Sequence, residues 1–113
     1  MNIQIFGKSK CFDTKKAERF FHERGIKFQS VDLPSKGMSK RELESVVRAV
    51  GGVEQLLNEK HPDATLFHYL LPDAQFEKLL EDPSLLRTPI VRNGQKATVG
   101  EAQKIWAEWV KEG

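Results

Sequence analysis

The spacing of apolar residues changes from a two-residue period to a helical period within the first third of the chain. Residues 2–6 alternate between polar and apolar side chains and end at Gly7, which predicts a short strand and a turn. The next segment repeats its apolar residues at intervals of three and four, which predicts a helix with Asp13 and Thr14 as N-cap candidates. Residues 27–32 have the pattern of a second strand. This order predicts a right-handed βαβ unit.

The middle of the chain predicts helices. Ser39 and Glu42 have the spacing of a capping box, in which each side chain satisfies a backbone N–H of the other residue, so a helix is expected to begin there. Gly51 follows the last apolar position of this helix and should end it. Residues 66–71 are apolar without a clear period, so their structure stays open, while Pro72 suits the first turn of another helix.

The last third of the chain predicts a hairpin followed by a helix. Asn93-Gly94 lies between two short apolar segments and is a strong signal for a tight turn between antiparallel strands. Arg92, on the first of these strands, is expected to face solvent. The final helix should bury a face that consists of Ala102, Ile105, Trp106, Trp109 and Val110. The predicted order is therefore β-α-β, several helices, and β-β-α, which describes an α/β domain.

Composition narrows the classes of protein that fit. The 113 residues suit one domain, and 39% apolar with 30% charged residues indicates a folded, globular chain. No apolar stretch is long enough to span a membrane, and the N-terminus lacks the pattern of a secretory signal, so we expect a cytoplasmic protein. A net charge of +2 gives little reason to expect nucleic-acid binding. With one cysteine and three histidines that lack ligand spacing, we expect no internal disulfide, no metal and no bound cofactor.

The single cysteine, Cys11, lies where reactive groups are common in α/β proteins. It follows the first predicted strand and precedes the first helix, at the carboxyl edge of the sheet. The N-terminus of a helix and nearby lysines favour the thiolate, whereas Asp13 opposes it, so we expect a lowered pKa of Cys11. The alternative is a cysteine that only packs as a small apolar residue. The flanking lysines are Lys8, Lys10, Lys15 and Lys16.

Five segments taken together resemble the arsenate reductase-like (ArsC/Spx) family. They read CxDTxKAxxFxxxxGI, GxSxxEL, LLN, DPSLLRTPIV and NGQKATVG, and they occur in the family's order between Ile3 and about Trp109. The resemblance implies a thioredoxin-like (glutaredoxin-like) fold in one domain, residues 1–113. It implies a mixed four-stranded sheet with a helical insertion at about 38–82 between the βαβ and ββα halves. Pro89 would be the cis-proline beside the reactive cysteine.

The resemblance also marks three positions at which the family's arsenate reductases carry arginines that bind the oxyanion. Lys60 stands at the first position, Thr88 at the second with Arg87 one residue earlier, and no arginine at the third. A one-residue shift in an extended chain turns a side chain to the other face, so Arg87 should not simply replace the missing arginine. Lysine does not bind an oxyanion bidentately, so arsenate reduction is not expected. Lys60 and Arg87 would still supply positive charge to a bound substrate.

Many members of the family carry a second cysteine three residues after the first, and this chain has Thr14 there. An internal disulfide cannot form, so an external thiol such as glutathione would have to complete a reaction cycle. The sequence most resembles an uncharacterised branch in which some members carry selenocysteine at the active position. We therefore expect a monothiol oxidoreductase in which Cys11 attacks a small or protein disulfide, or a small oxidant. Thr88 and Pro89 would present backbone groups to the substrate.

A function of a different class stays open. The Spx branch contains regulators that bind the C-terminal domain of the RNA polymerase α subunit, and Gly51 or Gly52 lies where that branch makes its contact. A glycine that ends a helix is the more ordinary explanation of these positions. The alternatives to an enzyme are therefore an Spx-like regulator and a non-catalytic interaction module.

Overall fold

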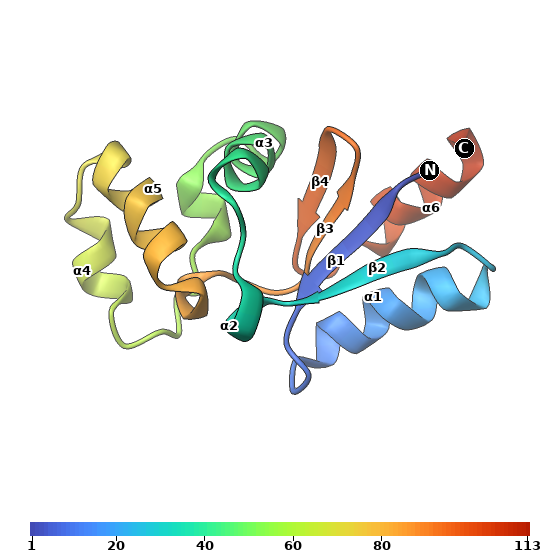
Figure 1. Cartoon of the computed structure of the whole chain (residues 1–113), viewed down its shortest axis with the longest axis horizontal. Helices are drawn as coiled ribbons and strands as arrows, with labels where there is room; N and C mark the ends of the chain where they lie inside the picture. Colours follow the sequence, from blue (N-terminus) through green and yellow to red (C-terminus); the bar gives the residue numbers. More distant parts are fainter.

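The computed structural model describes all residues, 1–113, and contains one mixed sheet flanked by helices (Figure 1). The strand order is β2-β1-β3-β4. β1 and β2 run parallel, whereas β3 is antiparallel to both β1 and β4. The strands are β1 (Ile3–Gly7), β2 (Phe28–Asp32), β3 (Ile90–Asn93) and β4 (Lys96–Val99). The first half of the sheet is thus a parallel βαβ unit and the second an antiparallel hairpin.

Two helices pack on one face of the sheet, and a helical segment extends the molecule on the other side. α1 (Phe12–Glu23) connects β1 to β2, and α6 (Gln103–Glu112) follows β4. Between β2 and β3 come α2 (Leu33–Lys36), α3 (Lys40–Val50), the 3₁₀ turn η1 (Val53–Leu56), α4 (Ala64–His68), α5 (Pro72–Glu81) and the 3₁₀ turn η2 (Pro83–Leu85). This segment makes the protein elongated, with extents of 42 × 26 × 22 Å. None of the helices combines the length and the apolar character that crossing a membrane requires.

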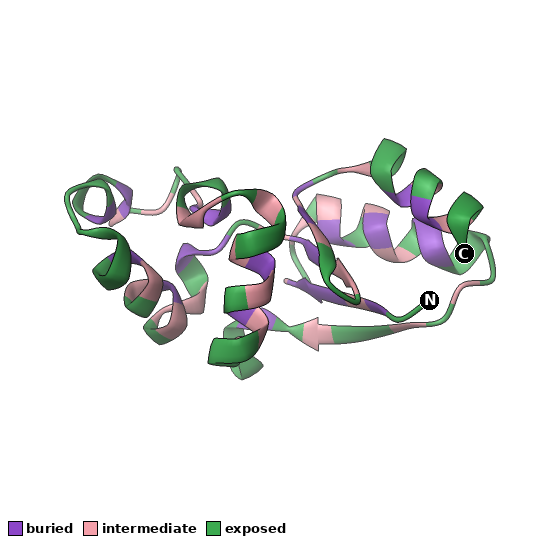
Figure 2. Ribbon diagram, turned by 90° about the horizontal axis from the view of Figure 1, so that it is seen from above, coloured by how far each residue is buried: buried purple, intermediate pink, exposed green.

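Alternate residues of β1 face two separate clusters of buried side chains. In Figure 2, buried residues, in purple, lie in the strands and in helices on both sides of the sheet. Ile3 and Ile5 face α1 and α6, whereas Phe6 faces the helical segment between β2 and β3. The first cluster is completed by Ala17, Phe20, Phe21, Val91, Trp106 and Trp109. The second contains Leu33, Leu43, Val46, Leu56, Leu57, Ala64, Phe67, Leu79, Leu85, Leu86 and Ile90. The central strand therefore contributes to both halves of the core.

The capping box predicted for the middle of the chain is confirmed. The Ser39 hydroxyl accepts from the Glu42 N–H at 3.1 Å, and the Glu42 carboxylate accepts from the Ser39 N–H at 2.9 Å. Gly51 ends α3 with a φ of +94°, a left-handed conformation that glycine adopts without a steric penalty. Residues 66–71, whose structure the sequence left open, begin within α4, and Phe67 is the one large side chain among them that is fully buried.

The structure begins α1 earlier than the sequence predicted. Its N-cap is Cys11, whose backbone is extended, and not Asp13 or Thr14. Thr14 lies inside the first turn of the helix, where its side chain is buried against Gly7. A threonine that packs inward in this way cannot cap the helix from outside, which explains why the propensity-based assignment was wrong.

The hairpin forms between β3 and β4 with a loop of two residues, Gly94 and Gln95. Gly94 has a φ of +63°, and no residue other than glycine has a positive φ. Glycine therefore occupies the first loop position, as in a type II′ turn, and Asn93 pairs with Lys96 as the last residue of β3. The predicted hairpin is confirmed, with its turn shifted by one residue.

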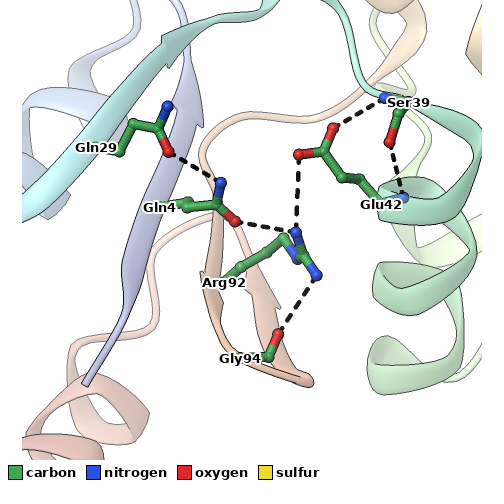
Figure 3. A network of polar contacts seen from close by, with 6 residues as sticks. All are labelled: Gln4, Gln29, Ser39, Glu42, Arg92 and Gly94. Atoms are coloured by element: carbon green, nitrogen blue, oxygen red, sulfur yellow. Dashed lines mark hydrogen bonds and ion pairs between the residues drawn. The ribbon is translucent and has the colours of Figure 1, made fainter.

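Arg92 lies on the face of the sheet that α3 covers, so the expectation that it faces solvent is wrong (Figure 3). Its side chain is 17% exposed. Nη1 donates to Gln4 Oε1 at 2.9 Å and lies 3.8 Å from Glu42 Oε2, while Nη2 donates to the Gly94 carbonyl at 3.5 Å. Because Glu42 also closes the capping box of α3, the same carboxylate stabilises the start of that helix and connects it to the sheet.

The buried face of α6 is centred on two tryptophans. Trp106 is fully buried, and its indole N–H donates to the hydroxyl of Thr98 on β4 at 2.9 Å. Trp109 is also buried, whereas Ile105 remains 44% exposed, contrary to its predicted inward position. The indole hydrogen bond fixes α6 to β4, since the N–H has no access to water.

Replacement of this hydroxyl should reduce stability. The variant Thr98→Val keeps the shape of the side chain but leaves the buried indole N–H of Trp106 unpaired, which should lower the free energy of unfolding by about 1–3 kcal/mol. Urea denaturation would measure this change. Thr98→Ser keeps the acceptor and serves as the control, and equal stability of Thr98→Val and the wild type would contradict the assigned role.

Candidate active site around Cys11

Cys11 lies at the junction of β1 and α1, as the sequence predicted. A turn over residues 8–11 closes with a hydrogen bond from the Cys11 N–H to the Lys8 carbonyl at 3.1 Å. The Cys11 carbonyl then accepts from the Lys15 N–H at 3.3 Å, which places the cysteine at the N-cap of α1. Its side chain is partly buried and forms no disulfide. The thiol is therefore held at a helix N-terminus and still reaches the surface.

Thr14, three residues further on, lies directly behind the cysteine. Its side chain is 5% exposed and packs against Gly7, where an added Cβ would come within 2.3 Å of Thr14 Cγ2. The Thr14 hydroxyl also accepts from the Lys8 N–H at 3.4 Å. Gly7 therefore has to be glycine for Thr14 to occupy this position, and the two residues together set the path of the chain into the active-site turn.

The local environment lowers the pKa of Cys11. Burial is the largest influence and raises this pKa, but hydrogen bonds from the hydroxyls of Thr14 and Thr88 and from the backbone N–H groups of Thr14 and Asp13 together outweigh it. The uncharged thiol instead donates to the Thr88 carbonyl at 3.6 Å. The direction agrees with the sequence-based expectation. Its cause agrees only in part: backbone N–H groups at the helix N-terminus lower the pKa, as expected, but the two threonine hydroxyls were not foreseen and the flanking lysines are not among the contributors.

The segment before β3 runs past the sulfur. The Thr88-Pro89 peptide bond is cis, and the Pro89 carbonyl accepts from the Gly100 N–H at 2.8 Å. The Thr88 N–H donates to no group of the chain. A free backbone donor therefore lies next to Cys11, in the place where the sequence predicted that Thr88 and Pro89 would present backbone groups.

The sulfur opens on a cavity of about 310 Å³ whose walls come from distant parts of the sequence. Lys8 and Asp13 line it from the active-site turn and α1, Lys60 from the loop after η1, and Arg87 and Thr88 from the segment before β3. The predicted anion-binding residues Lys60 and Arg87 are thus brought together with the cysteine.

Backbone pairing between two buried leucines holds the loop that carries Lys60 next to the segment that carries Arg87. Leu57 and Leu86 form an isolated antiparallel bridge, and the Arg87 N–H donates to the Leu56 carbonyl at 2.8 Å. All three leucines belong to the core. The loop that carries Lys60 and the segment that carries Arg87 are therefore held together by backbone hydrogen bonds and by the burial of these leucines, of which Leu86 lines the cavity.

Arg87 reaches the cavity by a route that the sequence did not suggest. Its guanidinium lies beside Gly100, where an added Cβ would come within 2.9 Å of Nη2, and Nη1 donates to the Gln55 carbonyl at 3.3 Å. The segment before Pro89 is not a regular strand, so the argument that a one-residue shift turns Arg87 away does not hold. Because Gly100 has no side chain, there is room beside it for the Arg87 guanidinium.

The lysines around the cysteine separate into different environments. Lys8 lines the Cys11 cavity and also a second hollow, which it shares with Lys15, Glu18 and Asp32, whereas Lys15 does not line the Cys11 cavity. Lys10 is exposed and lines neither hollow. Of the lysines nearest in sequence, only Lys8 is therefore placed to act on a ligand in the cavity.

His61 has carboxylates nearby, and its hydrogen bonds explain the arrangement without a metal ion. Nitrogen or oxygen atoms of His61, Asp63 and Asp82 lie within 4.8 Å of one another. Nδ1 of His61 accepts from the Asp63 N–H at 2.9 Å, so the ring proton is on Nε2, which lies 2.9 Å from Ser84 Oγ. A protonated Nε2 is not available as a ligand. The cluster connects the Lys60 loop to η2.

Gly51 and Gly52, at the position relevant to an Spx-like regulator, both have positive φ values, of +94° and +145°. No heavy atom lies within 4 Å of a Cβ built on either residue. The backbone conformation that ends α3 and begins η1 is thus sufficient to explain both glycines.

Comparison with known proteins shows which family this chain belongs to. The family model described as ArsC family matches residues 6–109. The chain belongs to the ArsC family. A curated relative, the uncharacterized protein YusI of Bacillus subtilis (strain 168), is 25% identical over 107 residues, which cover 88% of this chain and 91% of the relative.

Solved structures show the same fold at low sequence identity. An arsenate reductase from Vibrio cholerae superposes with a TM-score of 0.84 at 23% identity, with coverage of 96% of this chain and 97% of the other. An ArsC family related protein from Bacteroides fragilis gives a TM-score of 0.85 at 16% identity, also with coverage of 96% and 97%. The fold is thioredoxin-like, as the sequence resemblance implied. Family and fold together support a thiol-dependent, oxidoreductase-like role.

The lowered pKa of Cys11 predicts how fast the thiol is alkylated at each pH. Only the thiolate reacts with iodoacetamide, so the rate should fall as pH decreases through the pKa of Cys11, with a midpoint below the usual value for cysteine of about 8.5. Thr14→Val removes one donor to the sulfur and should move the midpoint to higher pH. Thr14→Ser keeps the hydroxyl and should not. An unchanged midpoint in Thr14→Val would contradict the role assigned to Thr14.

Proposed function

We propose that this protein is a monothiol thiol–disulfide or small-oxidant oxidoreductase in which Cys11 is the nucleophile. The observation that carries the proposal is the position of the sulfur. It lies at the N-terminus of α1, with a pKa lowered by hydrogen bonds, and it opens on a cavity lined by three cationic side chains, Lys8, Lys60 and Arg87. A thiolate is the reactive form of cysteine, and a cavity beside it can orient the bond to be attacked.

The reaction begins when the Cys11 thiolate attacks one sulfur of a disulfide. A new bond forms between Cys11 Sγ and that sulfur, while the second sulfur leaves as a thiolate. With a hydroperoxide as the oxidant, the same thiolate would attack the terminal oxygen, the O–O bond would break, and an alcohol or water would leave after protonation, so that Cys11 becomes a sulfenic acid. In both cases Cys11 is oxidised and has to be reduced before the next cycle.

A second, external thiol completes the cycle in this proposal. Position 14 holds threonine, and the chain contains no other cysteine, so no internal thiol can release the mixed disulfide. A thiol such as glutathione attacks the sulfur bonded to Cys11 Sγ, so that the Cys11 thiolate leaves and an external disulfide forms. A reducing compartment such as the cytoplasm supplies such thiols, which is consistent with the expected location.

The substrate would also contact the backbone beside the cis peptide bond. The Thr88 N–H is free to donate, and Thr88 lines the cavity. An extended peptide or peptide-like substrate can accept this hydrogen bond as a short additional strand. Thr88 and Pro89 would therefore align the substrate, while Lys60 and Arg87 would attract its negative charge.

Arsenate is a less suitable substrate for this cavity. Of the side chains that line it, only Arg87 carries a guanidinium, and one of its N–H groups is already bonded to the Gln55 carbonyl. Lys8 and Lys60 supply point charges and not the planar pair of donors that fits two oxygens of an oxyanion. We therefore infer a sulfur substrate in preference to the oxyanion named for the Vibrio cholerae relative.

The proposal predicts a covalent adduct confined to residue 11. After incubation with an excess of a small disulfide, intact-protein mass spectrometry should show one added half-disulfide, and the external thiol should remove it. Cys11→Ser should eliminate both the adduct and any thiol-dependent reduction, a loss of at least about 100-fold because no other thiol is present. Circular dichroism would verify that the variant is folded. A slow reaction comparable to that of an unactivated thiol would contradict the proposal.

A further inference from the structure

Four of the seven large apolar side chains that the protein leaves exposed come from one short segment, at the end of α4 and just before α5. They are between 38% and 83% exposed, and we call them the apolar patch: Leu66, Tyr69, Leu70 and Leu71. α4 and α5 lie at the end of the molecule opposite to α6 and both chain ends (Figure 1). A cluster of exposed apolar side chains in a soluble domain indicates an interaction surface.

A hollow of about 440 Å³ lies at this patch. Leu66, Tyr69 and Leu70 line it, together with Phe67 and Leu85, which belong to the buried core. None of the residues that line this hollow also lines the Cys11 cavity. The patch is therefore a surface separate from the active site, and an inference about it does not depend on the proposed function.

Two side chains of opposite charge complete the wall of the hollow. Asp63 lies at the N-cap of α4, and Lys78 lies on α5. Both are partly buried, and neither forms an ion pair within the chain. An acid and a base without ion-pair partners, at the edge of an apolar hollow, complement a surface that presents the same two charges in the reverse order.

A second copy of this chain presents such a surface. In a two-fold symmetric pair every contact occurs twice, so one contact between Asp63 and the partner's Lys78 pairs all four charges. A partner with charges of a single sign would leave either Asp63 or Lys78 unpaired in the interface. An anionic membrane surface attracts lysine but repels aspartate. The charge pattern around the hollow therefore favours association of the chain with itself.

We propose that the apolar patch is the interface of a two-fold symmetric homodimer in which Asp63 of each protomer pairs with the partner's Lys78. Leu71, which does not line the hollow of its own chain, is then available to enter the hollow of the other. The patch is small beside the roughly 800 Å² that each partner buries in a standard interface, so we expect a dissociation constant of about 10–100 µM. Both Cys11 cavities stay accessible, since they share no residue with the hollow.

Sedimentation equilibrium of the wild type tests whether the dimer forms. Over protein concentrations of about 5 to 500 µM, the apparent mass should rise from that of one chain towards that of two. A reductant in the buffer prevents a disulfide between two Cys11 residues, so that only non-covalent association is measured. An apparent mass that stays at one chain over the whole range would overturn the proposal.

Charge reversal tests the pairing across the two-fold axis. Asp63→Lys brings two lysines together at both contacts, and Lys78→Asp brings two aspartates together, so each variant alone should associate at least about tenfold more weakly. An equimolar mixture of the two variants should restore association, because the mixed dimer pairs a lysine with an aspartate at both contacts. Native mass spectrometry distinguishes this mixed dimer from either homodimer. Unweakened association of the single variants, or a mixture that remains monomeric, would overturn the proposal.

Substitution of an exposed aromatic residue tests the apolar part of the interface. Tyr69→Ser removes a side chain of the patch and should weaken association at least about tenfold. Phe12→Ser removes an exposed aromatic side chain of α1, outside the patch, and should leave association unchanged. Circular dichroism and the rate of iodoacetamide labelling of Cys11 should stay as in the wild type for the patch variants, which shows that they keep the fold. Association of Tyr69→Ser as strong as that of the wild type would contradict the assigned interface.

Discussion

The antiparallel pairing of β1 with β3 is the constraint on which the site depends. Phe6 pairs with Ile90 at the end of these strands, so the turn after β1 meets the segment before β3. The result is a contact of 3.6 Å between Cys11 Sγ and the Thr88 carbonyl, although 77 residues separate them in sequence. Side chains of both strands belong to the buried core, and burial of apolar surface therefore fixes the relative position of the groups at the active site.

The helical segment between β2 and β3 extends this arrangement. Polar contacts of Arg92 with Glu42 and Gln4 attach it to the sheet, and so does apolar packing of its buried leucines on Phe6 and Ile90. Within the segment, the bridge between Leu57 and Leu86 holds the loop that carries Lys60 next to the residues that carry Arg87. The insertion is thus part of the active-site wall, and its distance in sequence from the cysteine does not reflect its distance in space.

Sequence patterns were sufficient for the order and type of the main elements, because the period of apolar residues is strong in β1, α1, α3 and α6. The family resemblance, and not the patterns, pointed to Lys60 and Arg87; both line the same cavity as Cys11, and their roles there stay predictions. The patterns failed where a side chain's direction depends on tertiary contacts. Thr14 reads as a helix cap but packs inward on Gly7, and Arg92 reads as a solvent-facing strand residue but lies under α3. No local pattern encodes which neighbour covers a residue.

The contact of η1 with Arg87 was beyond sequence reasoning for the same reason. Only the pairing of Leu57 with Leu86 places this turn next to Arg87, whose side chain donates to the Gln55 carbonyl. The cause of the lowered pKa was predicted only in part. The helix N-terminus was foreseen, whereas the hydroxyl of Thr88 was not, because only the fold brings Thr88 next to Cys11.

The ends of the 113-residue chain lie beside each other, as Figure 1 shows, at the amino edge of the sheet. Met1 precedes β1, whereas Cys11 follows it, so a whole strand separates both ends from the sulfur. An affinity tag, a surface linker or a fused fluorescent protein attached at either end would therefore leave the thiol unobstructed. The same proximity makes the chain suitable for circular permutation, with new ends opened in an exposed connection far from the cysteine.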